Sequence, residues 1–262
     1  MSNNNFTNKK GLKIQYHKYI PEKPGRIGII LHGVGEYPDV YRPFFEKLEA
    51  NDIGYYAITH QGHGKSEGRR GHVNRFTDYT ADVKQLIEIA KNEGHEIDFM
   101  FGHSMGGLIA IYFNLQYIGD ASKLILSAPA LGIARKIPLW IRLLIKPMSL
   151  LWPTFSQKSG LAETNNDPMY ANVLSARWLT ELQAAQEYCI KNAVRFSSPL
   201  HIFHSTNDDL ASFESAYKFW DLAKSDVKTF SKEDYPGHNF LKHTNEEERK
   251  QTIDKIIKLI ND

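Results

Sequence analysis

The stretch "FGHSMGGL" (Phe101–Leu108) places one serine, Ser104, among glycines. Its "GHSMG" matches G-x-S-x-G, a pattern in which the serine stands on a sharp turn between a strand and a helix. Side chains beside such a serine would collide with the neighbouring elements, which gives Gly102 and Gly106 a steric reason to be glycine. The apolar run "IDFMFG" precedes the motif and "MGGLIAIYFNL" follows it at helical spacing. This context predicts that Ser104 is a nucleophile.

A serine nucleophile needs a general base, and the base needs an acid that orients it. In folds with this turn the acid and then the base follow the serine, each on a loop after a later strand. The loop "STNDDL" after the predicted strand Leu200–His204 offers Asp208 and Asp209. Spacing favours Asp208 and leaves Asp209 to face solvent or cap the next helix. The Pro-Gly turn in "DYPGHNF" offers His238, whereas His243 follows that loop and is expected at the surface or at a helix entry.

Acyl transfer also needs hydrogen-bond donors where the carbonyl oxygen gains negative charge. One donor is expected from the amide of Met105, at the N-terminus of the helix after the serine. The second is expected from Val34, in the loop "HGVGE" that directly follows the apolar strand "RIGIILH", with His32 and Glu36 bracing this loop. His103 is expected to pack beside the pocket, because its place next to the serine aims it away from the hydroxyl.

Short apolar runs alternate with segments of helical periodicity, which is typical of an α/β fold with a mostly parallel sheet. Strands are predicted at 12–20, 26–32, 53–59, 97–102, 123–129 and 198–205 and in "VKTFSK", and helices at 41–50, 76–91, 105–115, 213–224 and 246–260. No strand is predicted between 130 and 197, where helix-like segments are separated by Pro and Gly. We therefore expect a flexible tail at 1–10, a core at 11–129 and 198–262, and a helical cap at 130–197.

Composition excludes several classes of partner. The 262 residues carry a net charge of +2 without a concentrated basic block, so no nucleic-acid partner is expected. The one cysteine, Cys189, cannot form an internal disulfide, and "MSNNNFTNKK" lacks the apolar stretch of a secretory signal. A cytoplasmic location is therefore expected. The eleven histidines show no metal-ligand spacing, so no metal site is expected.

The longest apolar segment lies in the predicted cap. "IPLWIRLLIKPMSLLW" (Ile137–Trp152) is apolar nearly all round but shorter than the roughly 20 residues that span a bilayer. One interpretation is the buried core of the cap. The other is an apolar rim that receives acyl chains and contacts a lipid surface through Trp140, Leu143 and Leu144.

Several segments together resemble the α/β-hydrolase superfamily, and within it the monoacylglycerol lipase and lysophospholipase group. They include "LHGVGEY", "HQGHGKSEGRRGHV", "FGHSMGGLIAIY", "NDPMY" and "YPGHNFLKH", and they cover most of the chain from about residue 10 to residue 260. The order of "HGVGE", "GHGKSEG" and "GHSMGG" makes the resemblance specific to that group. It implies Ser104 as nucleophile, Asp208 as acid, His238 as base, and Val34 and Met105 as oxyanion donors.

The resemblance implies an α/β-hydrolase fold with a helical cap after the sixth strand, and it favours the apolar rim for that cap. It also implies a serine hydrolase, without a cofactor, for esters of one acyl chain such as monoacylglycerol or lysophospholipid. A short-chain carboxylesterase, an acyltransferase and a non-catalytic binding module on this fold are the alternatives, and the oligomeric state stays open. The chain departs from the group at Thr59, where Asp is usual, and at His204-Ser205, where Gln-Gly or similar is usual.

Overall fold

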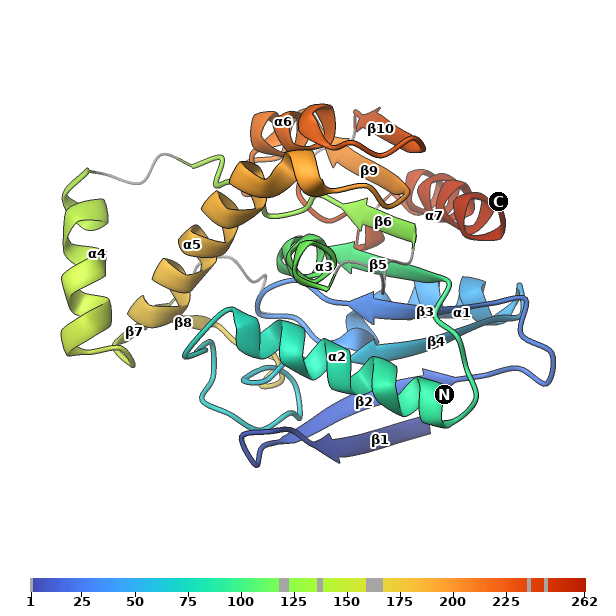
Figure 1. Cartoon of the computed structure of the whole chain (residues 1–262), viewed down its shortest axis with the longest axis horizontal. Coiled ribbons are helices and arrows are strands. Elements are labelled where there is room, and N and C mark those ends of the chain that lie inside the picture. Colours follow the sequence, from blue (N-terminus) through green and yellow to red (C-terminus); the bar gives the residue numbers. More distant parts are fainter. Residues whose placement is uncertain (1, 118–122, 136–138, 159–166, 235–236, 243–244) are drawn as a thin grey trace.

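One eight-stranded sheet organises the chain (Figure 1). The computed structural model describes residues 2–117, 123–135, 139–158, 167–234, 237–242 and 245–262. The strands of the sheet are β1 (Ser2–Thr7), β2 (Lys13–Tyr19), β3 (Arg26–Leu31), β4 (Ile53–Ile58), β5 (Phe99–His103), β6 (Lys123–Ser127), β9 (Leu200–Ser205) and β10 (Lys228–Glu233). Their order is β1-β2-β4-β3-β5-β6-β9-β10. Every neighbouring pair from β4 to β10 is parallel, whereas β2 pairs antiparallel with β4 and β1 with β2. The predicted α/β-hydrolase architecture with a mostly parallel sheet is therefore confirmed.

Helices cover both faces of this sheet. They are α1 (Arg42–Glu49), α2 (Thr77–Asn92), α3 (Met105–Gln116), α6 (Phe213–Leu222) and α7 (Glu246–Asn261). Short 3-10 turns are η1 (Pro38–Tyr41), η2 (Ala193–Arg195) and η3 (Phe240–Lys242). Between β6 and β9 the chain forms α4 (Leu139–Leu151), β7 (Ser156–Lys158), β8 (Val173–Ser175) and α5 (Ala176–Asn192). In the part of the chain that the structure describes, none of the helices has the length and hydropathy needed to cross a membrane.

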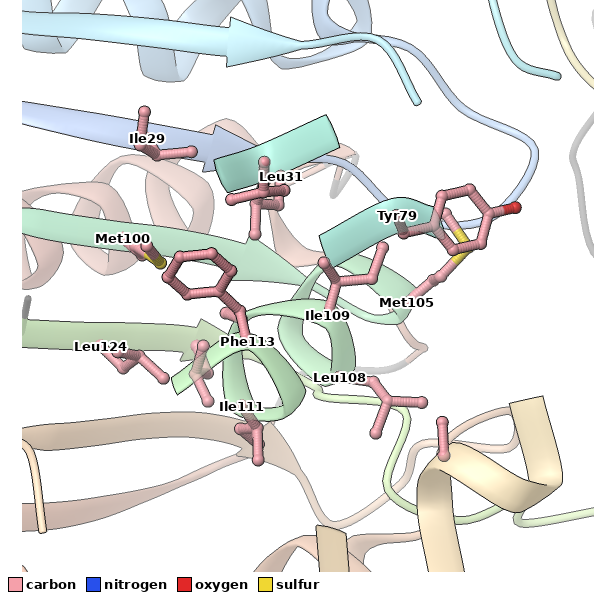
Figure 2. Packing of buried hydrophobic residues seen from close by; sticks show 14 of the residues in the cluster. Ile29, Leu31, Tyr79, Met100, Met105, Leu108, Ile109, Ile111, Phe113 and Leu124 are labelled. Atoms are coloured by element: carbon pink, nitrogen blue, oxygen red, sulfur yellow. The ribbon is translucent and has the colours of Figure 1, made fainter. Parts of the chain in front are cut away.

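Alternate residues of the parallel strands supply two hydrophobic cores, one on each face of the sheet. In β3, Ile29 packs in the core that includes α2 and α3, whereas the next residue, Ile30, packs in the core that includes α1 and α7. In β5, Met100 and Phe101 divide in the same way. Figure 2 shows Ile29, Met100 and Leu124 gathered around Phe113 and the rest of α3. Burial on both faces explains why these strands are continuous apolar runs in the sequence.

The N-terminus is a strand, so the expected flexible tail over the first ten residues is wrong. Ser2–Thr7 pairs antiparallel with β2, in a register that runs from Ser2↔Lys18 to Thr7↔Lys13. The side chain of Phe6 is buried, and its ring centroid lies 6.1 Å from that of Tyr16. An edge strand needs only a backbone ladder and one apolar residue on its inner face. The polar composition of this segment therefore gave no apolar pattern from which the strand could be predicted.

The cap contains two short strands, which corrects the expectation of a strand-free segment from 130 to 197. Ser156–Lys158 pairs antiparallel with Val173–Ser175, residue by residue. Three residues are too few for an alternating apolar pattern to identify a strand in the sequence. The second strand leads directly into α5, where the Ser175 hydroxyl caps the helix by accepting a hydrogen bond from the Trp178 amide at 3.1 Å.

Truncation of the buried side chain on β1 tests whether this strand contributes to stability. We expect Phe6→Ala to lower the free energy of unfolding by about 2–3 kcal/mol, because it removes an apolar ring from the core. Urea unfolding measures the change. Asn5→Ala is the matched control, since Asn5 is exposed on the same strand and its truncation should change stability by less than about 0.5 kcal/mol. Equally small effects of both substitutions would contradict the docking of β1.

Candidate active site

Ser104 stands on the turn between β5 and α3, as its motif predicts. Its backbone has φ 52° and ψ −115°, a conformation that residues other than glycine rarely adopt. A Cβ atom on Gly102 would lie 2.6 Å from the Gly106 carbonyl oxygen, and one on Gly106 would lie 2.1 Å from the Leu31 carbonyl oxygen. Both positions therefore require glycine. The Ser104 amide donates to the carbonyl of Ser127 on β6 at 2.9 Å, which fixes the turn against the sheet.

The structure brings the predicted serine, histidine and aspartate together. His238 Nε2 lies 2.8 Å from Ser104 Oγ, and His238 Nδ1 lies 2.7 Å from Asp208 Oδ2. A carboxylate only accepts hydrogen bonds, so Nδ1 carries the proton and Nε2 is left to accept one from the serine hydroxyl. Ser104 and Asp208 are buried, and the imidazole that joins them is 14% exposed. The arrangement can therefore pass a proton from Ser104 to His238.

Asp208 is held by four donors. Its Oδ1 accepts from the amides of Leu210 and Ala211, each at 2.9 Å. Its Oδ2 accepts from His238 and also lies 3.2 Å from Nε2 of a second histidine, His204. Burial alone would raise the pKa of the Asp208 carboxyl, but the hydrogen bonds from His204 and His238 outweigh burial and hold this pKa well below its ordinary value. Asp208 is therefore a carboxylate at neutral pH.

The two alternative residues weighed on sequence lie apart from this arrangement or outside the described part of the chain. Asp209 is exposed and forms an ion pair with Arg135 at 2.5 Å, as expected for a residue that faces solvent. His243 lies outside the described residues. The neighbouring His103 places its Nδ1 3.0 Å from the hydroxyl of Ser127, and its ring is tilted against that of His238, with the ring centroids 4.8 Å apart.

Glu36 braces the "HGVGE" loop, as the sequence suggested. Its Oε2 accepts from the Gly33 amide at 3.2 Å and from the Tyr41 hydroxyl at 2.5 Å. Its Oε1 accepts from Lys242 at 2.6 Å and from Asn239 at 3.0 Å. Burial raises the pKa of Glu36, but the Lys242 ammonium and these hydrogen bonds lower it to about 2 overall. Because Asn239 follows the candidate base directly, Glu36 ties the candidate oxyanion loop to the histidine loop.

A mostly apolar pocket opens beside Ser104. Its lining residues are Gly33, Val34, Glu36, His103, Ser104, Met105, Ala130, Gly132, Ile133, Trp178, Leu179, Leu182, Gln186, Leu210, Ala211 and His238. Val34, in the loop after β3, and Met105, the first residue of α3, both line the pocket beside the serine. The assignment of their amides as oxyanion donors stays a prediction. The sequence reading missed the wall formed by α5. Four-residue spacing places Trp178, Leu182 and Gln186 on one face of α5. This spacing was the sign in the sequence that they could line a pocket together.

Of the three predicted substrate contacts on α4, the structure describes the side chain of Leu144. The side chains of Trp140 and Leu143 lie outside the described residues. Leu144 is 51% exposed and is not among the lining residues of the pocket. A substrate-binding role for these three residues stays a prediction. In Figure 1, α4 lies beyond α5 at the outer edge of the molecule, away from the sheet.

Buried histidines support the two loops beside the serine. The ring of His32 lies 4.4 Å from that of His60 and 5.4 Å from that of His63. His32 Nδ1 donates to the Gly33 carbonyl at 2.8 Å, and its Nε2 accepts from the His60 amide at 3.0 Å. Burial lowers the pKa of His32 to about 3, that of His63 to about 4 and that of His60 well below its ordinary value. Among the described residues, no three His, Cys, Asp or Glu side chains are arranged to hold a metal ion.

These buried histidines predict a loss of stability in mild acid. Unfolded histidine binds a proton near pH 6.5, whereas His32, His60 and His63 stay neutral in the native state to much lower pH. The unfolded state therefore binds more protons as pH falls from 6.5 to about 4, and each histidine removes about 1.4 kcal/mol of stability per pH unit. Asp82 acts in the opposite sense, because burial raises its pKa to about 7 and the native state then holds its proton.

Urea unfolding at pH 7, 6 and 5 measures this dependence. We expect the free energy of unfolding to fall across this range, with a slope of more than one proton below pH 6, because the three histidines outnumber the opposing carboxyl. Constant stability between pH 6.5 and pH 5 would contradict the prediction.

Comparisons with known proteins identify the family of the chain. The family model described as serine aminopeptidase, S33, matches residues 22–245. The monoacylglycerol lipase of Mycolicibacterium smegmatis is 26% identical over 99% of this chain and 96% of its own length. The phospholipase YtpA of Bacillus subtilis is 27% identical over 80% of this chain and 86% of its own length.

A similarity of fold extends to solved structures. The crystal structure of the monoacylglycerol lipase of Paleococcus ferrophilus matches with a TM-score of 0.84 at 24% identity, over 95% of this chain and 98% of that chain. The chain is thus similar in sequence to monoacylglycerol lipases, and it belongs to the serine aminopeptidase S33 family of α/β-hydrolases.

Proposed function

We propose that this protein hydrolyses carboxylic esters of a single acyl chain, monoacylglycerol or lysophospholipid, through an acyl-enzyme on Ser104. The observation that carries the proposal is the continuous hydrogen-bonded series from the Ser104 hydroxyl through His238 to Asp208, at 2.8 Å and 2.7 Å. Relatives named monoacylglycerol lipase and phospholipase support the substrate class.

The proposed reaction follows from the positions of these groups. Ser104 Oγ attacks the ester carbonyl while His238 Nε2 takes its proton, and the Asp208 carboxylate stabilises the resulting imidazolium. The amides of Val34 and Met105 donate to the oxyanion, and the positive end of the α3 dipole adds to its stabilisation. The ester C–O bond then breaks as His238 returns the proton to the departing alcohol. Water, activated by the same histidine, releases the fatty acid from Ser104.

The lining of the pocket favours an ester with an apolar chain over a peptide. An aminopeptidase needs an exposed acidic group to bind the ammonium of its substrate. Among the described pocket residues the acidic side chain is Glu36, and it is paired with Lys242. The α5 wall instead offers Trp178, Leu179 and Leu182, which suit an acyl chain.

Active-site labelling and paired substitutions test the triad. We expect a fluorophosphonate probe to label the wild-type protein and not Ser104→Ala. Asp208→Asn should lower kcat by about 10⁴-fold, because the amide favours the wrong imidazole tautomer. Asp209→Asn is the matched control and should change kcat less than about threefold, since Asp209 is solvent-exposed. Labelling that persists in Ser104→Ala, or a larger loss in the Asp209 variant, would overturn the assignment.

We also propose that the cap contacts the surface of aggregated lipid substrate. Large apolar side chains are exposed on and after α4, where Leu150 is 72%, Leu151 68% and Trp152 65% exposed, and Phe155 lies nearby at 45%. Lys146, exposed on the same helix, adds a positive charge that suits anionic lipid. Exposed apolar side chains gathered in one segment mark a site of interaction.

Substrates of increasing chain length test both the lipid class and this surface. We expect hydrolysis of monoacylglycerols to improve beyond acyl chains of four carbons. The combined variant Leu150→Ser, Leu151→Ser, Trp152→Ser should lose at least about tenfold activity on aggregated monoacylglycerol, because apolar area no longer binds the lipid. It should retain its activity on a soluble short p-nitrophenyl ester.

Val227→Ser is the control, since Val227 is 54% exposed and directly precedes β10, outside the cap. A sharp preference for two- to four-carbon acyl groups would refute the lipase proposal. Equal losses of the combined variant on aggregated and soluble substrates would refute the lipid-surface proposal.

A further inference from the structure

A second histidine lies against the carboxylate of the candidate triad. His204 is near the end of β9, four residues before Asp208, and it is fully buried. Its ring packs edge-on against Phe213, with the ring centroids 5.6 Å apart. The two residues before it on the strand, Ile202 and Phe203, are apolar and buried in the two cores. A polar ring at this depth needs a hydrogen-bonding partner, because an unsatisfied buried polar group is destabilising.

The partners of His204 determine which of its nitrogens carries the proton. Nε2 lies 3.2 Å from Asp208 Oδ2 and 3.3 Å from the Ala211 carbonyl oxygen. Both of these atoms only accept hydrogen bonds, so Nε2 must be the donor. Nδ1 is buried and has no hydrogen-bond partner in the described part of the chain. The neutral Nε2–H tautomer is therefore favoured, because imidazolium would bury a second N–H donor without an acceptor.

This contact completes the set of donors around the carboxylate. A carboxylate offers about four lone-pair sites, and two backbone amides occupy those of Asp208 Oδ1. Asp208 Oδ2 is approached by the Nε2–H of His204 and by the Nδ1–H of His238. The negative charge of one oxygen is therefore shared between two imidazoles, and the carboxylate cannot rotate without losing a donor on each side.

We propose that His204 is a positioning residue of the catalytic site, which holds Asp208 Oδ2 in line with His238 and shares its charge. The inference rests on the proposed function, in which Asp208 orients the base. His204 touches neither Ser104 nor the pocket, so it acts through Asp208 alone. The other titratable groups around the base are His103, Glu36 and Lys242, and their hydrogen-bond partners are residues other than His204.

Three substitutions distinguish the effect of the Nε2–H donor of His204 from the effect of the packing of its ring. His204→Phe keeps the planar ring and its packing on Phe213 but removes the donor. His204→Gln can return an amide N–H to the place of Nε2. His204→Asn places its amide where Nδ1 now lies, away from Asp208. The pH profile of kcat/KM on a short p-nitrophenyl ester and the rate of fluorophosphonate labelling report the effect on each variant.

We expect His204→Phe to lower kcat by about tenfold, near the lower end of the losses seen when the outer partner of a metal ligand is removed. The acidic limb of its kcat/KM profile should move up by about one pH unit, because an unshared carboxylate stabilises protonated His238 more strongly. His204→Gln should restore both properties to within about threefold of wild type, and His204→Asn should behave like the Phe variant.

The matched control is His201→Phe on the same strand. His201 is also largely buried, but its Nδ1 bonds to the Thr229 hydroxyl on β10 at 2.9 Å. This variant should leave the profile unchanged, and urea unfolding of all variants shows that they are folded. An unmoved acidic limb in His204→Phe, or equal losses in the Gln and Phe variants, would overturn the proposal.

The low-field NMR resonance of the His238 Nδ1–H monitors its hydrogen bond to Asp208 in the absence of substrate. It should change in His204→Phe and return in His204→Gln, because it reports the hydrogen bond to Asp208 directly. An unchanged resonance in His204→Phe would contradict the positioning role. Failure of the proposed function can be distinguished from failure of this positioning role. In the first case the wild-type protein would not react with fluorophosphonate, whereas the resonance would still change in the His204 variants.

Discussion

The hydrogen bond from His238 to the buried Asp208 carboxylate joins two loops that lie 30 residues apart in the chain, and it orients the imidazole that faces Ser104. Burying a carboxylate is unfavourable unless donors surround it. The protein surrounds Asp208 with backbone amides of its own loop and with two imidazoles. These contacts keep the carboxylate charged, and the charge in turn selects the tautomer in which His238 accepts from the serine.

The parallel sheet makes this meeting of loops possible. Ser104, Asp208 and His238 each follow the carboxyl end of a different parallel strand, and all such ends lie at one edge of the sheet. The Ser104 turn adds a second constraint, since the backbones of β3 and α3 approach too closely for any side chain at residue 106. The Glu36–Lys242 pair then links the candidate oxyanion loop to the histidine loop.

The cap divides into two parts with different tasks. Its second helix, α5, lies against α3 and supplies an apolar wall to the pocket. Its first helix, α4, contacts α5 and exposes apolar side chains to solvent. The segment that leads from β6 into the cap is hydrogen-bonded to the loop that carries Asp208. Ile133 forms an antiparallel β-bridge with Ala211, and the Ser212 amide donates to the Gly132 carbonyl at 3.0 Å. The start of the cap and the acid loop therefore form one local structure.

The sequence alone was sufficient for the features that depend on local chemistry. Strands buried on both faces, such as β3, must be apolar throughout, and the tight turn at Ser104 admits only glycine at residues 102 and 106. Likewise, an acid and a base must follow the serine in a fixed order of strands, so Asp208 and His238 were selected before any contact was known. These constraints are local in the chain, or follow from the order of its elements.

Only the tertiary structure decided the features that depend on contacts between distant residues. A polar N-terminal segment forms β1 because its backbone pairs with the edge of β2. Backbone pairing of this kind leaves no pattern in the side chains. Trp178 and Leu182 line the pocket because α5 packs against α3, the helix that begins directly after Ser104. His204 departs from the family pattern in the sequence, but its hydrogen-bond partner is evident only in the structure, where β9 and the loop after it place Nε2 beside Asp208. A sequence specifies which groups are available, whereas packing decides which of them meet.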